Sequence, residues 1–301
     1  MSAAGSPLAG FTLAAEAEAA VAAVRLAAAA VMRVYATKFG VEYKGDRAAN
    51  DPVTEADHAA NLAIVDALSR AFPTDAIVTE ETALPAGFER AHRCWFVDPL
   101  DGTRDFVARN GEFCVMVGLA IDGRARLGAV GIPVIDGGSI LVGEVGARAV
   151  RLVDGRAPID VRVSSLTDPA KARFVVSRSR RTPLFDAILA HLGSREARGL
   201  GSVGVKISAL VDGSADAYVQ PAESLDPALS TTHGSAKLWD TCAPEAILRA
   251  AGGALTDGLG RELDYATQDV AHRFGIVGSN GALHAPLLAA IGAVTPKHRA
   301  P

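Results

Sequence analysis

The spacing of apolar and polar residues predicts two helices at the start of the chain. Apolar residues recur at helical intervals from Val21 to Tyr35, which indicates an amphipathic helix over residues 12–39. A loop rich in charge and glycine follows. Thr54 then has the hydroxyl that suits the N-cap of a second helix.

Short apolar runs follow the second helix and predict a series of strands. They occupy residues 76–79, 94–97, 113–121, 127–134, 140–145 and 147–153. Asp-Gly pairs at 122–123 and 154–155 are turn signals along this stretch. Helices followed by hairpin-linked strands are typical of an α+β arrangement.

From about residue 160 the pattern changes to an alternation of strands and helices, which favours an α/β arrangement. The predicted strands cover residues 173–176 and 215–219, and the predicted helices open at 182–183 or cover 203–212, 241–251 and 283–291. No repeat or low-complexity linker separates the two patterns. We therefore expect two halves, residues 1–160 and 161–301, that pack into one body.

Composition places the chain among ordinary globular proteins. Hydrophobic residues make up 49% and charged residues 21% of its 301 residues, which excludes a disordered or fibrous protein. A net charge of −4 argues against nucleic acid or an anionic membrane surface as a partner. A concentrated basic pocket for a small anion is still compatible with this charge.

The cysteines and the apolar stretches indicate a cytoplasmic protein. Three scattered cysteines form no disulfide framework and suit a reducing compartment. The alanine-rich start, with Glu16 and Arg25 in it and no basic n-region before it, does not fit a signal peptide. The uncharged stretch 274–296 contains polar residues and a proline, so it is a poor membrane span.

Carboxylates at the end of an apolar run are the first candidates for chemistry. Asp98 and Asp101 stand three positions apart after the run 94–97, and Gly102-Thr103 follows. A buried carboxylate is costly unless a cation or hydrogen bonds compensate it, and Mg²⁺ prefers such oxygen ligands. A helix opening at Gly102 would offer its N–H groups to a phosphate. A plain Asp-Gly turn explains the segment equally well.

Other acidic residues repeat this ambiguity. Glu80 follows the apolar run 76–79, while Asp57 and Asp240 stand at predicted helix starts. Helix capping is a sufficient explanation for the last two when each is taken alone.

The motifs in their fixed order resemble a known superfamily. A loop lysine, PVTEAD, EE, DPLDGT, GSVGVK and WDT follow one another between residues 40 and 290. This series resembles the lithium-sensitive, Mg²⁺-dependent phosphomonoesterases of the inositol monophosphatase superfamily. DPLDGTRDF at 98–106 and RNGEF at 109–113 are similar to the bacterial 3′(2′),5′-bisphosphate nucleotidases, and KLWDTCAPE at 237–245 is similar to their animal and plant counterparts.

The resemblance implies a fold, an activity and a set of metal ligands. The fold would be a layered αβαβα sandwich, and the activity would convert adenosine 3′,5′-bisphosphate (PAP) to AMP with two to three Mg²⁺ ions. The implied ligands are Glu80, Asp98, the Leu100 carbonyl, Asp101 and Asp240, with Asp57 near a third ion. Asp57 and Thr103 would accept protons, and the implied catalytic set is Thr54, Asp57, Glu80 and Thr103.

The resemblance also implies substrate contacts, most of them in the second half. Ser202 and Lys206 match a segment that contacts the nucleotide, although a flexible helix entry with a solvated lysine would explain these residues alone. Ser177 and Arg180 match a segment that holds the second phosphate or the nucleoside, with Arg180 in the place of a histidine of the animal members. The remaining implied contacts are Gly102, Thr103, Lys237 and Asp240. The stretch 223–235 is longer than in the family pattern and could lengthen the pocket rim.

Two competing functions remain open from sequence. An inositol monophosphatase or inositol polyphosphate 1-phosphatase would share the same metal site. A non-catalytic nucleotide-sensing module would be expected to lose a metal carboxylate, whereas this chain retains all of those named above. The resemblance also leaves room for a homodimer.

Overall fold

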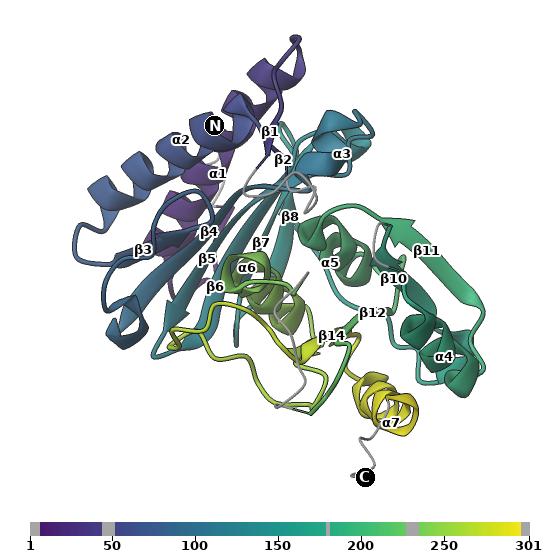
Figure 1. Cartoon of the computed structure of the whole chain (residues 1–301). Helices are drawn as coiled ribbons and strands as arrows, with labels where there is room; N and C mark the ends of the chain where they lie inside the picture. Colours follow the sequence, from purple (N-terminus) through teal and green to yellow (C-terminus); the bar gives the residue numbers. More distant parts are fainter. Residues whose placement is uncertain (1–6, 44–51, 179–180, 227–234, 296–301) are drawn as a thin grey trace.

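The computed structural model describes residues 7–43, 52–178, 181–226 and 235–295. Two large β-sheets lie side by side with helices on their outer faces and between them (Figure 1). Arg180, most of the predicted loop that contains the lysine, and residues 227–234 of the long stretch before Lys237 lie outside the described residues.

The first sheet is formed by the apolar runs of the first half. Its strand order is β3-β4-β5-β6-β7-β8-β9, and every neighbouring pair is antiparallel except β3 and β4. The strands are β3 (Ala76–Thr79), β4 (Arg93–Asp101), β5 (Cys114–Ile121), β6 (Arg124–Ile132), β7 (Ser139–Glu144), β8 (Ala149–Leu152) and β9 (Ile159–Asp160).

Two long helices cover the outer face of this sheet. They are α1 (Ala14–Tyr35) and α2 (Glu55–Ala71), which pack on each other and on β4 to β6. The alanines of α1 allow this close packing, because its buried positions are filled only by alanine and valine. Leu13 offers no side-chain cap, and Glu144 of β7 instead accepts the N–H groups of Thr12 and Leu13 at 2.8 and 3.1 Å.

The second sheet belongs to the second half and has the order β11-β10-β12-β14-β13. Strand β10 is parallel to β11 and to β12, and the other pairs are antiparallel. Helices α4 and α7 pack on its outer face. The elements are β10 (Arg173–Ser177), α4 (Pro183–Leu192), β11 (Glu196–Leu200), β12 (Ala217–Pro221), β13 (Ala254–Thr256), β14 (Gly275–Ser279) and α7 (His284–Val294).

Helices α5 (Val203–Val211) and α6 (Leu238–Ala250) form a middle layer between the two sheets (Figure 1). The resulting order is helices, sheet, helices, sheet, helices, which confirms the expected αβαβα sandwich. The remaining described elements are short: β1 (Glu42–Tyr43), β2 (Pro52–Val53), α3 (Thr103–Val107) and the 3₁₀ turns Phe88–Arg90, Ile135–Gly137 and Pro169–Lys171.

A row of glycines lets α6 approach the first sheet closely. Gly118, Gly128 and Gly143 are direct register partners on β5, β6 and β7. A Cβ atom at any of them would lie less than 3.0 Å from backbone atoms of Ala243 or Ile247 in α6. The glycines therefore set the distance between the sheet and the helix that carries Asp240.

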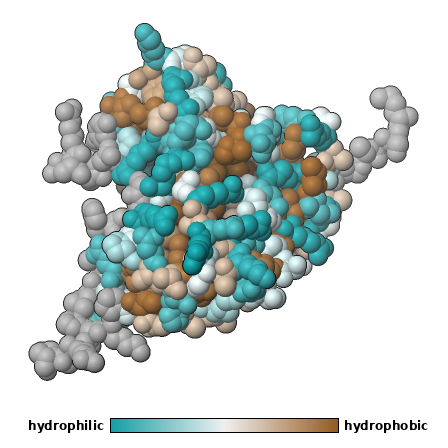
Figure 2. Space-filling view, turned by 90° about the vertical axis from the view of Figure 1, so that its right-hand side faces the viewer, coloured by the Kyte–Doolittle hydropathy of each residue, from teal (hydrophilic) through white to brown (hydrophobic). Residues whose placement is uncertain are grey.

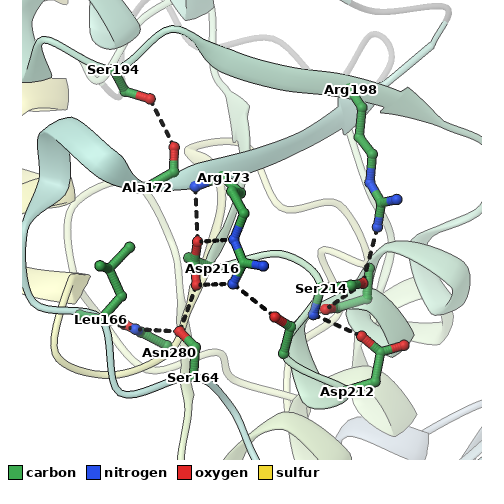
Figure 3. A network of polar contacts seen from close by, with 12 residues as sticks. Ser164, Leu166, Ala172, Arg173, Ser194, Arg198, Asp212, Ser214, Asp216 and Asn280 are labelled. Carbon is green, nitrogen blue, oxygen red and sulfur yellow. Dashed lines mark hydrogen bonds and ion pairs between the residues drawn. The ribbon is translucent and has the colours of Figure 1, made fainter.

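A buried network of hydrogen bonds connects several segments at one end of the second sheet (Figure 3). Asp216 is fully buried and accepts two hydrogen bonds from the Arg173 guanidinium, at 2.8 and 2.9 Å, and one from Ser164. Asn280 joins the network through Ser164 and the Leu166 carbonyl. Burial raises the pKa of Asp216, but hydrogen bonds from Arg173 and Ser164 outweigh it and hold the pKa below its usual range.

Most of the predicted elements are present, with shifted ends. The helix predicted over 12–39 covers Ala14–Tyr35, and the helix predicted to open at 241 begins at Leu238. Strand β11 was not predicted because its side chains are partly or fully exposed and form no apolar run. Strand β14 is buried within the uncharged stretch 274–296, where no alternation marks it as a strand.

The face seen from the right of Figure 1 carries apolar residues in separate patches among hydrophilic ones (Figure 2). Among the described residues, none of the helices is long and apolar enough to cross a bilayer.

Candidate active site

The five predicted acidic residues come from four elements that meet at one edge of the first sheet. Glu80 follows β3, Asp98 and Asp101 end β4, Asp57 is in the first turn of α2, and Asp240 is in the first turn of α6. Asp98 is 2% exposed, and the charges of Glu80, Asp101 and Asp240 all act on it. The structure thus brings Glu80 and Asp240, which are 160 positions apart in the sequence, close to the same buried carboxylate.

Thr54 caps α2 as predicted and also positions Asp57. The Thr54 hydroxyl accepts the Ala56 N–H at 3.2 Å. The backbone N–H and the side-chain O–H of Thr54 both donate to Asp57 Oδ2, each at 2.7 Å. The other oxygen, Oδ1, accepts the hydroxyl of Thr103 at 3.2 Å. The capping and site interpretations of this segment are therefore compatible.

The end of β4 is shaped to present oxygen atoms. The register with β5 shifts between Asp98 and Asp101, which bends the strand. The Leu100 N–H donates to Asp98 Oδ1 at 3.0 Å. The Leu100 carbonyl lies 3.0 Å from the Thr103 hydroxyl, whose one proton is shared between this carbonyl and Asp57 Oδ1. Gly102 follows at φ +90°, a backbone conformation that favours glycine, and α3 begins at Thr103.

Asp101 connects the first sheet to the N-terminus of α5. Its Oδ2 accepts the N–H groups of Val203 and Gly204, the latter at 3.2 Å. Burial raises the pKa of Asp101, while the charge of Lys206 and these two hydrogen bonds lower it. The first turn of α5 is thus attached to the same strand end that carries Asp98.

Asp240 caps its helix, as the sequence suggested, but it does so from the first turn and not from the N-cap position. It is the third residue of α6, and its Oδ2 reaches back to accept the Lys237 N–H at 2.7 Å. Thr241, its neighbour, is fully buried and lies 2.7 Å from His272 Nε2.

The acidic cluster carries an electrostatic cost. Burial raises the pKa of Asp98 well above its ordinary value, and the charges of Glu80, Asp101 and Asp240 raise it further. Burial likewise raises the pKa of Asp57 despite its hydrogen bonds from Thr54 and Thr103. A bound cation would compensate charges of this kind.

The donor set fits Mg²⁺ by its chemistry. The candidate ligands are carboxylates and one carbonyl oxygen, the hard donors that this ion prefers, with no thiolate or imidazole among them. Within the described ranges, however, no group of three or more Asp, Glu, Cys or His side chains is arranged so that it could hold a metal ion. Several of these carboxylates are instead turned toward backbone N–H groups, so metal binding would require side-chain rotation.

The predicted substrate residues at the start of α5 form hydrogen bonds within the protein itself. The Ser202 hydroxyl caps the helix by accepting the Val205 N–H at 3.1 Å. Lys206 is 2% exposed, and its Nζ donates to the carbonyls of Gly201 and of Ser202 and lies 5.3 Å from the Tyr218 ring centroid. The alternative of a solvated lysine at a flexible helix entry is therefore wrong.

The other predicted substrate residues lie at the ends of two elements. Ser177 ends β10, and Lys237 directly precedes α6 beside Asp240. Arg180 lies outside the described residues, so its predicted contact stays a prediction.

Sequence reasoning assigned no individual role to three charged residues next to this site, although Arg178 lies in the segment matched to a substrate contact. Arg178 forms ion pairs with Asp105 of α3 and with Glu112. Glu112 belongs to the RNGEF motif, which contributed to the resemblance without a role for any single residue. The signal that could have found it is a carboxylate just before a buried strand.

Comparisons with known proteins agree with the geometry. The model of the inositol monophosphatase family matches residues 13–295. The 3′(2′),5′-bisphosphate nucleotidase CysQ of Escherichia coli K12 is 35% identical over 251 residues, which cover 81% of this chain and 92% of the relative.

Solved structures with the same fold include two members of this family. The structure of CysQ from Bacteroides thetaiotaomicron superimposes with a TM-score of 0.69 at 27% identity, covering 89% of this chain and 98% of that one. Inositol monophosphatase from Anabaena superimposes with a TM-score of 0.73 at 26% identity, covering 95% and 98%. The matching residues, fold and acidic strand ends together show that this chain belongs to the inositol monophosphatase family.

Proposed function

We propose that the protein is a Mg²⁺-dependent 3′(2′),5′-bisphosphate nucleotidase that removes the 3′-phosphate of PAP and releases AMP. The observation that carries the proposal is the position of Asp98, buried among three other carboxylates beside the N-terminus of α5. The similarity to CysQ proteins over most of both chains supports the choice of substrate.

The metal ligands in this proposal are those that the resemblance implied. Glu80, Asp98, the Leu100 carbonyl, Asp101 and Asp240 would hold two ions, and Asp57 would lie near a third. Bound Mg²⁺ would lower the pKa of the attacking water and neutralise charge on the leaving oxygen.

Thr103 and Asp57 would handle the proton of the attacking water. Asp57 is held through Oδ2 by Thr54, which leaves Oδ1 facing the Thr103 hydroxyl. Thr103 could therefore accept a hydrogen bond from water while donating its own proton to Asp57.

Substrate orientation would be divided between the two halves of the chain. Gly102 and Thr103 would contact the reacting phosphate. Ser202 and Lys206 would contact the nucleotide from α5, with Ser177, Arg180 and Lys237 around the second phosphate. Holding both ends of the substrate keeps the reacting phosphorus in line with the attacking oxygen, which is the main source of rate in such a displacement.

The experiment that tests the substrate compares phosphate release from PAP and from inositol 1-phosphate under the same Mg²⁺ conditions. We expect kcat/KM to be at least about tenfold higher for PAP, because a site built for a second phosphate leaves charged groups unpaired with the inositol ester. A higher value for the inositol ester would favour inositol monophosphatase. Nucleotide binding without any phosphate release would favour a sensing module.

The cellular setting is part of the same proposal. All three cysteines are free and buried, which suits a protein that acts in the reducing cytoplasm. The homodimer for which the resemblance leaves room can be tested by light scattering, which would give twice the chain mass of 31.0 kDa for a dimer.

A further inference from the structure

Three charged residues connect the two sheets beside the candidate site, and we call Asp105, Glu112 and Arg178 the inter-sheet clamp. Arg178 directly follows β10 of the second sheet. Its guanidinium donates to Asp105 Oδ1 in α3 and, at 2.6 Å, to Glu112 Oε2 just before β5. The two carboxylate side chains are 16% and 19% exposed and the Arg178 side chain is 46% exposed, so solvent reaches these ion pairs from the arginine side.

Glu112 also holds the turn that leads into α5. Its Oε2 accepts the Gly201 N–H at 2.6 Å, and its backbone carbonyl accepts the Ser202 N–H at 3.1 Å. A Cβ atom at Gly201 would lie less than 3.0 Å from the Glu112 carbonyl oxygen and from Asp105 Oδ2. The turn is therefore in close contact with the clamp, and a larger residue than glycine would separate them.

The clamp is also held by Asn110, which lies between α3 and β5. Asn110 donates to Asp105 Oδ1, and its side-chain oxygen accepts the Glu112 N–H at 2.9 Å. Asn110 thus holds the Asp105 carboxylate and the Glu112 backbone independently of Arg178. Because α3 begins at Thr103, the clamp connects the helix that carries Thr103 to the turn that precedes Ser202 and Lys206.

We propose that Glu112 and Arg178 are positioning residues that fix the Gly201–Ser202 turn relative to Thr103. This inference rests on the proposed function. In that function one substrate must be held at both places, the reacting phosphate at Thr103 and the nucleotide at Ser202 and Lys206. Loss of the clamp lets the turn move, which weakens the hold on the nucleotide but leaves the groups that react with the phosphate in place.

The test is steady-state kinetics of Glu112→Gln and Arg178→Met with PAP and with p-nitrophenyl phosphate, which has no nucleoside and no second phosphate. We expect KM for PAP to rise about tenfold, with kcat within about twofold, because a hydrogen bond to a charged group is lost. Both constants for p-nitrophenyl phosphate should stay within about twofold. Arg178→Lys should raise KM for PAP less than Arg178→Met does, because lysine keeps the charge but cannot pair with both carboxylates in the same way.

A matched control is Glu196→Gln, which removes an exposed carboxylate at the other end of β11 and should leave both substrates unaffected. Equal losses with PAP and p-nitrophenyl phosphate would show a merely structural role and would overturn the proposal. Unchanged kinetics with both substrates would also overturn it.

A second measurement separates failure of the clamp from failure of the proposed function. Hydrogen exchange of residues 200–206 should be faster in Glu112→Gln than in the unmodified protein, whatever the substrate is. If the protein releases no phosphate from PAP, the proposed function fails while faster exchange still supports the clamp. Unchanged exchange in this segment would contradict the clamp.

Discussion

At the scale of single residues, the candidate site holds buried carboxylates that repel one another, at the place where the proposed chemistry needs a metal ion. Asp98 is buried beside three other carboxylates, and the Leu100 N–H, which donates to it at 3.0 Å, lowers its pKa. A residue selected only for stability would not carry a charge there. This cost is understandable if the residue binds cations.

The first prediction therefore concerns Asp98→Asn. The substitution should abolish phosphate release, because it removes a carboxylate assigned to both ions. It should also stabilise the metal-free protein by about 0.5–2 kcal/mol, because it removes a repulsive buried charge. Urea unfolding in the presence of a chelator measures the gain. Asp136→Asn, at an exposed residue with positive φ, is the control and should change neither property. Retained phosphate release would show that the metal assignment is wrong.

A second prediction concerns the buried His272. Burial lowers its pKa from 6.5 to about 4, so it stays neutral in the folded protein while the unfolded chain takes up a proton below pH 6.5. Stability is therefore lost as the pH falls from 6.5 toward 4, by about 2 kcal/mol at pH 5. His272→Gln should remove this part of the acid sensitivity.

Urea unfolding at pH 7.5 and pH 5 measures the effect of His272→Gln. The exposed His191, for which the same substitution should leave the pH dependence unchanged, is the control. An identical loss of stability on acidification in His272→Gln and the unmodified protein would contradict the assignment.

The residue scale also shows which parts of the site could be predicted. Thr54, Asp57, Asp98 and Asp101 stand in short local patterns, at a helix start and at a strand end, that the sequence displays directly. The role of Glu112 could not be predicted, because its partners Arg178 and Gly201 are 66 and 89 positions away. Their contact exists only once the two sheets have packed together.

At the scale of elements, helix α6 depends on the glycine row of β5, β6 and β7. Its first turn carries Asp240, and its middle rests directly against the sheet. The position of Asp240, a candidate metal ligand, is thus set by glycines on three strands of the first sheet.

Gly128→Val tests this dependence. The new side chain would overlap the Ala243 backbone and force α6 away from β6, which should destabilise the protein by about 2–3 kcal/mol in urea unfolding. It should also lower phosphate release, because Asp240 would move with its helix. Gly292→Ala in α7 is the control, since no atom lies within 4 Å of its added Cβ and stability should stay equal or rise. Equal stability of Gly128→Val and the unmodified protein would contradict the role of the glycine row.

Helices were easier to predict than the edge of the second sheet. The start of α2 follows from the Thr54 hydroxyl, and the alanine-rich start became α1. Strand β11 is defined by its parallel pairing with β10 rather than by its own composition. Such pairing is a property of the assembled sheet, so periodicity along one segment does not show it.

At the scale of the whole molecule, the sandwich brings distant segments to one edge. The acidic cluster combines four residues of the first half with Asp240 of the second, and Asp101 and the inter-sheet clamp both reach the start of α5. The order of the motifs in the sequence, through their resemblance to a family, predicted this convergence. Composition and hydrophobic periodicity alone predicted the α+β and α/β halves but not which edges meet.

The central claim is that the carboxylate cluster at Asp98 serves Mg²⁺-dependent phosphate release from PAP. The most direct measurement is the rate of phosphate release from PAP by chelator-treated protein as the Mg²⁺ concentration is raised from zero. We predict no turnover without the ion, saturable recovery as Mg²⁺ is added, and no recovery for Asp98→Asn. Full turnover by the chelator-treated protein before Mg²⁺ is added would contradict the claim.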